Sequence, residues 1–126
     1  MFRHVIRVRY GDCDMQGVVF NAHYLAYVDD AVDQFVRSSV GDYQAAGFDF
    51  MLKRISIEWA SPARYDDELT LTVVVSRWGT SSFDVTVEGS VGERPVLHAV
   101  VVYVSTMPGT ATSTPVPDAV RAALSE

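Results

Sequence analysis

The chain contains only one cysteine, Cys13, and one lysine, Lys53, among its 126 residues. A single cysteine excludes an intrachain disulfide and a zinc site built from cysteines. Only 10 basic residues stand against 16 acidic ones, which gives a formal net charge of −6. A protein that binds nucleic acid needs a basic surface that displaces counterions. The charge balance therefore predicts no nucleic-acid partner.

Long apolar runs are also missing. No uninterrupted run approaches the roughly 20 residues that a transmembrane helix needs, and the start of the chain, MFRHVIRVRY, lacks the apolar core of a signal peptide. We therefore expect no membrane span and a cytoplasmic location. At 48% hydrophobic and 21% charged residues, the chain is still apolar enough to fold around one core. Its length suits a single domain over residues 1–126.

Hydrophobic periodicity predicts a strand followed by one long helix. Residues 2–10 alternate apolar and mostly basic side chains, which is the period of a strand. From residue 21 to residue 38 the apolar spacing changes to three and four, which predicts an amphipathic helix. Asn21 is the expected N-cap of this helix. Its apolar stripe is formed by Leu25, Val28, Val32, Phe35 and Val36.

The remainder of the chain predicts four strands joined by short turns. The first ends near Trp59, and the others cover residues 69–78, 83–91 and 96–104, with GTSS as a hairpin turn. The last strand is apolar on both faces, so we expect it to be central, with His98 in the core. Self-association of the protein is the simplest way to cover the second apolar face. The order predicts an α+β fold, an antiparallel sheet of about five strands with one helix against it. A Pro/Thr/Ser-rich linker at 107–117 and a short C-terminal helix or tail at 118–126 follow.

The segment between the first strand and the helix, YGDCDMQGVVFNAHY, carries the groups best suited to chemistry. Asp12 and Asp14 precede a helix start, where backbone N–H groups are unpaired and carry partial positive charge. Such groups can stabilise an oxyanion, and a nearby carboxylate can attack a carbonyl or activate water. This is the minimum for acyl transfer. By spacing alone, the same residues are also typical of a turn and a helix cap, and they lack the further ligands of a calcium site.

Residues 8–31, VRYGDCDMQGVVFNAHYLAYVDDA, resemble the opening of the 4-hydroxybenzoyl-CoA thioesterase family of hotdog-fold acyl-CoA thioesterases. A second stretch, EWASPARYDDELTL over residues 58–71, resembles the Pro-Ala-Arg-Tyr turn of the same family. The resemblance covers residues 3–105. The first motif is carried by Tyr10, Asp14, Gly17, Val18, Val19, Phe20 and Tyr24.

The resemblance implies a hotdog fold, a curved antiparallel sheet around one long helix, and hydrolysis of an acyl-CoA thioester to free acid and CoA. No metal or organic cofactor is required for this chemistry. Asp14 is then the catalytic carboxylate, as nucleophile or general base, and the backbone N–H of Asn21 receives the thioester oxygen. Because sites in this family form between two protomers, a homo-oligomer is implied, either a dimer or a dimer doubled to a tetramer. The expected substrate-binding residues are Gly17, Val18, Tyr24 and Arg64.

Several alternatives stay open at this point. The chain could act on an acyl-carrier-protein thioester, be another hotdog enzyme, or bind acyl-CoA without catalysis. Asp12 is expected to be a turn acceptor, and His23 has no acidic or serine partner at a recognisable spacing. Asp30 on the helix is the second candidate for the base. Arg64, preferred for a CoA phosphate, could instead pair with an aspartate of its own turn.

Overall fold

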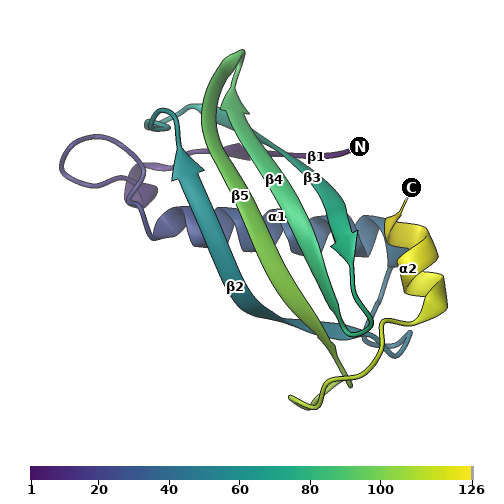
Figure 1. Ribbon diagram of the computed structural model, residues 1–126. Coiled ribbons are helices and arrows are strands. Elements are labelled where there is room, and N and C mark those ends of the chain that lie inside the picture. Colours follow the sequence, from purple (N-terminus) through teal and green to yellow (C-terminus); the bar gives the residue numbers. More distant parts are fainter. Residues whose placement is uncertain (126) are drawn as a thin grey trace.

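The elements of the computed structural model, which describes residues 1–125, follow the predicted order of strand, long helix and four strands (Figure 1). Glu126, at the end of the predicted C-terminal segment, lies outside the described residues. The elements are β1 (Phe2–Arg7), the 3₁₀ helix η1 (Tyr10–Asp12), α1 (His23–Val40), β2 (Asp49–Trp59), β3 (Glu68–Trp78), β4 (Ser82–Val91), β5 (Arg94–Thr106) and α2 (Asp118–Leu124).

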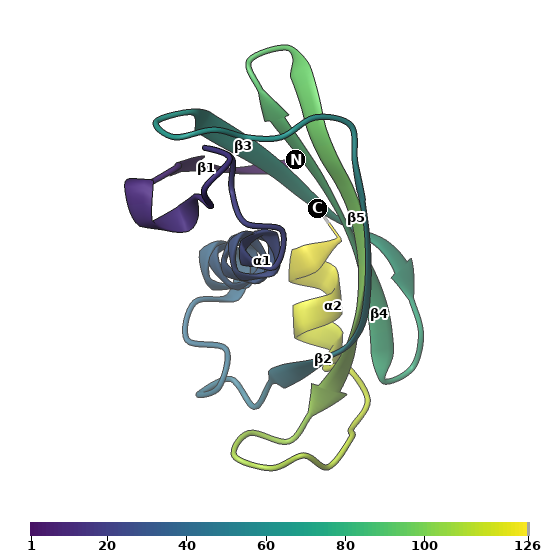
Figure 2. The ribbon, with the colours of Figure 1, turned by 90° about the vertical axis from the view of Figure 1, so that its left-hand side faces the viewer.

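The five strands form one antiparallel sheet in the order β1-β3-β4-β5-β2, so β1 and β2 are its edges. The sheet curves around α1, and α2 fills the space between the far part of α1 and the sheet (Figure 2). This arrangement confirms the α+β hotdog prediction. None of the helices within residues 1–125 has the length and apolar character needed to cross a bilayer.

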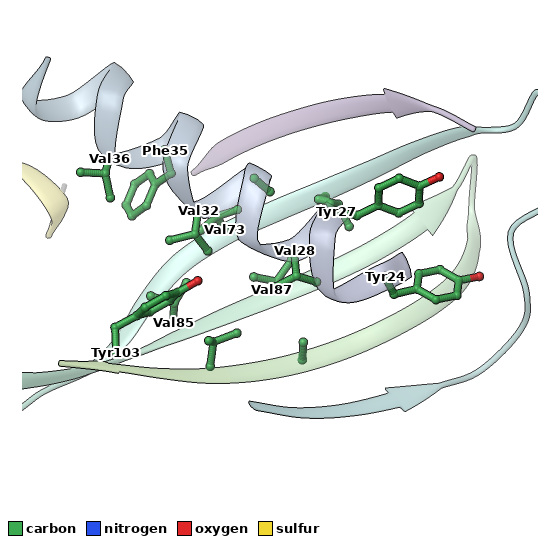
Figure 3. Packing of buried hydrophobic residues seen from close by; sticks show 14 of the residues in the cluster. Tyr24, Tyr27, Val28, Val32, Phe35, Val36, Val73, Val85, Val87 and Tyr103 are labelled. Carbon is green, nitrogen blue, oxygen red and sulfur yellow. The ribbon is translucent and has the colours of Figure 1, made fainter. Parts of the chain in front are cut away.

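The core lies between the concave face of the sheet and one side of α1 (Figure 3). On the strands, every second side chain points into this core, and on the helix every third or fourth side chain does so. The core is therefore formed by the apolar residues of both predicted periods. Each fully buried aliphatic side chain in such a core contributes about 1.5–3 kcal/mol. The helix contributes Val28, Val32 and Val36, and the sheet contributes Leu69, Leu71, Val73, Val85 and Val87.

The start of α1 differs from the prediction. The helix begins at His23, its N-cap is Ala22, and no side chain caps it, so the prediction of Asn21 as N-cap was wrong. Asn21 lies in the preceding turn, where its carbonyl accepts a hydrogen bond from the amide of Tyr24 at 3.3 Å. The buried stripe includes Tyr24 and Tyr27, whereas Leu25 is 39% exposed. The two tyrosines can lie in the buried stripe because the hydroxyl of each one has a hydrogen-bond partner.

Two other predictions on the strands were wrong. The first strand was predicted to reach residue 10 but ends at Arg7. Tyr10 lies in η1 with its ring exposed. The chain turns there because the amide of Asp12 donates a hydrogen bond to the carbonyl of Arg9. His98 is exposed rather than in the core. It shares the outer face of the sheet with Glu88, its partner in the β4–β5 register, and its Nδ1 lies 2.6 Å from Oε1 of that residue.

Candidate active site

The loop that carries the predicted catalytic acid is a tight turn closed by backbone hydrogen bonds. The amide of Asp14 donates to the carbonyl of Val18 at 2.9 Å, and the amide of Gly17 donates to the carbonyl of Asp14 at 3.0 Å. Gly17 has a φ of +77°, a conformation that glycine adopts without steric cost. A Cβ at this position would meet no atom of the chain within 4 Å. Gly17 is therefore needed for the shape of the turn and not for close packing within the chain.

The side chain of Asp14 is half-buried at the base of this turn. Its Oδ1 accepts a hydrogen bond from the amide of Gln16 at 2.8 Å, which fixes the orientation of the carboxylate. Within residues 1–125, its other oxygen, Oδ2, accepts no hydrogen bond. One oxygen is thus held by the protein, while the second is available to a water molecule or an electrophile.

The backbone amides just before α1 are also free. The amide of Phe20 donates to the carbonyl of Asp12 at 2.9 Å, and that of His23 donates to the carbonyl of Phe20 at 2.8 Å. The amides of the two residues between them, Asn21 and Ala22, donate to no group in the described part of the chain. Unpaired amides at a helix start carry partial positive charge and suit a carbonyl oxygen or an oxyanion.

A pocket of about 240 Å³ opens beside these amides. It brings together three of the predicted site residues, Val18, Asn21 and Tyr24, while Asp14, Gly17 and Arg64 lie outside its lining. Asp14 is joined to the pocket through its backbone bond to Val18. The other wall, which sequence analysis missed, is the segment after β2 and the last residue of that strand: Trp59, Ala60, Ser61 and Pro62. Its only sequence signal is the EWASP stretch that precedes the PARY turn.

The PARY turn packs against the loop and fixes this pocket. Val18 and Arg64 form an antiparallel bridge, in which the amide of Val19 donates to the carbonyl of Ala63 at 2.9 Å. The amide of Ala63 in turn donates to the hydroxyl of Tyr24 at 2.9 Å. Burial raises the pKa of this hydroxyl, so Tyr24 stays neutral. Its ring also contacts the indole of Trp59, with 5.7 Å between the ring centroids.

Arg64 is exposed at the edge of the turn. The aspartates that could have paired with it have other partners, because Asp66 pairs with Arg7 at 3.1 Å and Asp67 pairs with Arg94 at 3.4 Å. Within residues 1–125, the guanidinium of Arg64 has no ion pair or hydrogen bond. It can therefore bind an anion without first breaking a contact.

Asp12 has the partners that the sequence did not indicate. Its Oδ2 accepts hydrogen bonds from the hydroxyl of Tyr27 at 2.6 Å and the amide of Arg9 at 3.1 Å. Its Oδ1 lies 3.0 Å from Nε2 of His23, so His23 has an acidic partner that no recognisable spacing in the sequence indicated. Partial burial opposes ionisation of Asp12, but the Tyr27 hydroxyl, the Arg9 amide and the His23 charge outweigh it and lower its pKa. Burial and the bond to Asp12 raise the pKa of Tyr27.

Cys13 lies between the two aspartates and is half-buried. Burial, followed by the charges of Asp12 and Asp14, raises the pKa of its thiol. Because the thiolate is the reactive form, this environment disfavours a nucleophilic cysteine.

A second, larger groove of about 820 Å³ lies on the other side of the start of α1, along β1. It is lined by His23, Tyr27 and Asp12 among others, but by neither Asp14 nor Asn21. Asp30, the second candidate for the base, lies in this groove, and its Oδ2 is 2.9 Å from Nε2 of His4. No three histidine, cysteine or acidic side chains within residues 1–125 are grouped as metal ligands would be.

Comparisons with known proteins find similarity to thioesterases. A family model described as the thioesterase-like superfamily matches residues 8–124. The acyl-CoA thioester hydrolase YbgC of Escherichia coli is 35% identical over 85 residues, which are 64% of this chain and 63% of that relative's length. A thioesterase superfamily structure from Jannaschia sp. superposes with a TM-score of 0.90 at 24% identity, covering 98% of this chain and 90% of the other. A gentisyl-coenzyme A thioesterase superposes with a TM-score of 0.89 at 19% identity, covering 98% and 100%.

Proposed function

Because this chain belongs to the thioesterase-like superfamily, we propose that it hydrolyses an acyl-CoA thioester to a free acid and CoA. The observation that carries the proposal is that one short segment, residues 14–22, holds both a carboxylate oxygen and backbone amides that make no hydrogen bond within residues 1–125. In the described part of the chain, Oδ2 of Asp14 accepts no hydrogen bond and the amides of Asn21 and Ala22 donate none, and Asn21 lines an apolar pocket. The match to an acyl-CoA thioester hydrolase supports the choice of a thioester.

The reaction follows from the chemistry of these groups. The thioester oxygen accepts a hydrogen bond from the amide of Asn21, which makes the carbonyl carbon more electrophilic and stabilises the oxyanion. Asp14 either adds to this carbon, forming an anhydride that water hydrolyses, or takes a proton from the water that attacks. In both routes the C–S bond breaks and CoA leaves as the thiolate, which is then protonated.

The two ends of the substrate have different supports. The pocket of Val18, Tyr24 and Trp59 offers apolar surface to the acyl group. Arg64 stands on the adjoining turn, and its guanidinium has no ion pair or hydrogen bond among residues 1–125. It suits a phosphate of CoA because its fork of donors matches phosphate oxygens. The phosphopantetheine of an acyl carrier protein presents the same thioester and phosphate chemistry as CoA. The assay therefore includes both acyl-CoA and an acyl carrier protein.

The proposal is tested by measuring free thiol released from short, long and aromatic acyl-CoAs and from an acyl carrier protein. We expect turnover of at least one acyl-CoA, and a fall in kcat of about 100-fold or more in Asp14→Asn, since general-base catalysis is typically worth that much. Asp30→Asn is the matched control, because that carboxylate lies in the other groove. Unchanged turnover in Asp14→Asn contradicts its role. Binding of acyl-CoA by the wild type without turnover favours a binding protein instead.

We further propose that the protein works in the cytoplasm, as a dimer or a dimer doubled to a tetramer. β2 is an edge strand whose Met51 and Leu52 side chains are 50% and 44% exposed. An exposed apolar edge strand is a ready site for pairing with another chain. Light scattering after size exclusion should report an oligomer for the wild type and a smaller species for Leu52→Glu. A monomeric wild type contradicts the proposal.

A further inference from the structure

Each of the three histidines of this chain lies next to a carboxylate, but only one of these pairs is close to the proposed catalytic acid. His4 faces Asp30 at 2.9 Å in the groove along β1, and His98 faces Glu88 at 2.6 Å on the outer face of the sheet. His23 faces Asp12, two residues before Asp14, and the Asp12 side chain is the least exposed of the three carboxylates, at 16%.

Asp12 connects the loop to the helix by both of its carboxylate oxygens. Oδ1 lies against Nε2 of His23, and Oδ2 accepts the hydroxyl of Tyr27, one turn further along α1. In the described part of the chain, these are the polar side-chain contacts between the loop of residues 11–20 and α1. Because the two partners lie four residues apart on one helix face, the two contacts together restrict both rotation of the carboxylate and its displacement along the helix. The main-chain carbonyl of Asp12 also accepts the amide of Phe20, just before the free amides.

We infer that Asp12 and His23 are positioning residues, which through their mutual contact fix Asp14 relative to the free amides at the start of α1. The inference rests on the proposed function. Asp14 follows Asp12 by two residues in a turn that is closed on itself, so a displacement of Asp12 moves the acid as a unit with its turn. The amides of Asn21 and Ala22 move with the other partner of this contact, His23, because these two residues lead directly into the helix that begins at His23.

The test compares histidine variants of two pairs. His23→Ala should lower kcat about 10- to 100-fold with KM changed less than about twofold, because a misplacement of about 1 Å costs up to 100-fold while the pocket wall is untouched. His23→Gln should recover part of the loss, since its amide nitrogen can reach the same oxygen of Asp12. His98→Ala removes a histidine that also has an acidic partner, Glu88 at 2.6 Å, and should leave kcat unchanged. Asp12→Ala combined with His23→Ala should be no slower than Asp12→Ala alone.

Cys13 offers a second measurement that does not depend on turnover. It is the only thiol of the chain, it is half-buried next to Asp12, and its Sγ lies 3.7 Å from the carbonyl of Arg9. If His23 holds the loop, His23→Ala should make Cys13 react about fivefold faster with a disulfide reagent, because local opening exposes the thiol. Loss of the histidine charge alone would act in the opposite direction, since it leaves Asp12 to disfavour the thiolate.

The outcomes separate this inference from the proposed function. A His23→Ala variant with wild-type kcat and a wild-type rate of Cys13 labelling overturns the positioning role, and so does a kcat loss of the same size in His98→Ala. A wild type that turns over no acyl thioester overturns the proposed function, and full turnover in Asp14→Asn overturns the catalytic role of Asp14. In that case the rate of Cys13 labelling still decides whether His23 holds the loop.

Discussion

Tyr24→Phe should destabilise the protein, although it removes a single oxygen atom. In the wild type, the hydroxyl of Tyr24 accepts the amide of Ala63, and both residues are almost completely buried. Phenylalanine keeps the ring in the core but leaves this buried N–H group without an acceptor. The effect is local to the site, because the carbonyl of Ala63 accepts the amide of Val19 in the pocket wall.

The magnitude follows from the cost of an unsatisfied buried donor, which is about 1–3 kcal/mol. The apolar area buried by the ring changes little, so no gain of similar size offsets this cost. An unfolding entropy of about 2.1 cal/mol/K per residue makes each kcal/mol equivalent to about 4 °C in a chain of 126 residues. We therefore expect the Tm of Tyr24→Phe to fall by about 4–11 °C.

Urea denaturation and thermal scans followed by circular dichroism measure this difference. Tyr65→Phe is the matched control, because its side chain is 59% exposed and its hydroxyl has no partner within residues 1–125, so the change should stay within about 0.5 kcal/mol. If Tyr24→Phe is as stable as Tyr65→Phe, the hydroxyl does not satisfy the amide of Ala63 and the proposed support of the pocket wall is wrong.

Three further predictions concern stability, each measured by urea denaturation. Gly17→Ala should cost about 1–2 kcal/mol because of its φ of +77°, whereas Gly11→Ala, with open space around its Cβ, should be neutral; equal effects contradict this. Gly89→Ala should cost about 1–3 kcal/mol, since its Cβ would lie 2.9 Å from Cγ of Leu97; a more stable variant refutes the clash. The lowered pKa of Asp12 means that its ionised form stabilises the fold above its unfolded pKa of about 3.9, a contribution that is lost as pH falls through the folded pKa. Asp12→Asn should therefore lose less stability than the wild type between pH 7 and about pH 3, and an equal loss is the contrary result.

Much of the fold could be predicted because two periods of apolar residues are well separated along the chain. Period two in β3 and β4 and period three to four in α1 each bury one face, and the GTSS turn joins β3 and β4 as expected. Asn21 and His98 show where this reasoning fails. The N-cap depends on where the preceding loop meets the helix, and the face occupied by His98 depends on its register with Glu88.

The candidate site was predictable where it is contiguous and not where it is assembled from distant parts. Val18, Asn21 and Tyr24 lie within one motif and line one pocket. Trp59 and Ser61 join them only because the Val18–Arg64 bridge brings the end of β2 against the loop. The partnership of Asp12 and His23 spans the loop and the helix, so no fixed spacing indicates it.

The structure gives different environments to two aspartates that the sequence presents almost identically. Asp12 is surrounded by donors on both oxygens, which stabilise its charge and make it a poor base and a poor nucleophile. Among residues 1–125, the side chain of Asp14 receives one donor, which orients the carboxylate and leaves its second oxygen without a hydrogen bond. Neighbouring titratable groups with unequal environments commonly divide structural and chemical work in this way. Burial, followed by the same two charges, raises the pKa of the thiol between them, which disfavours its reactive thiolate form. Of the three side chains, only Asp14 is left both oriented and available, which is why the proposed chemistry is placed on it.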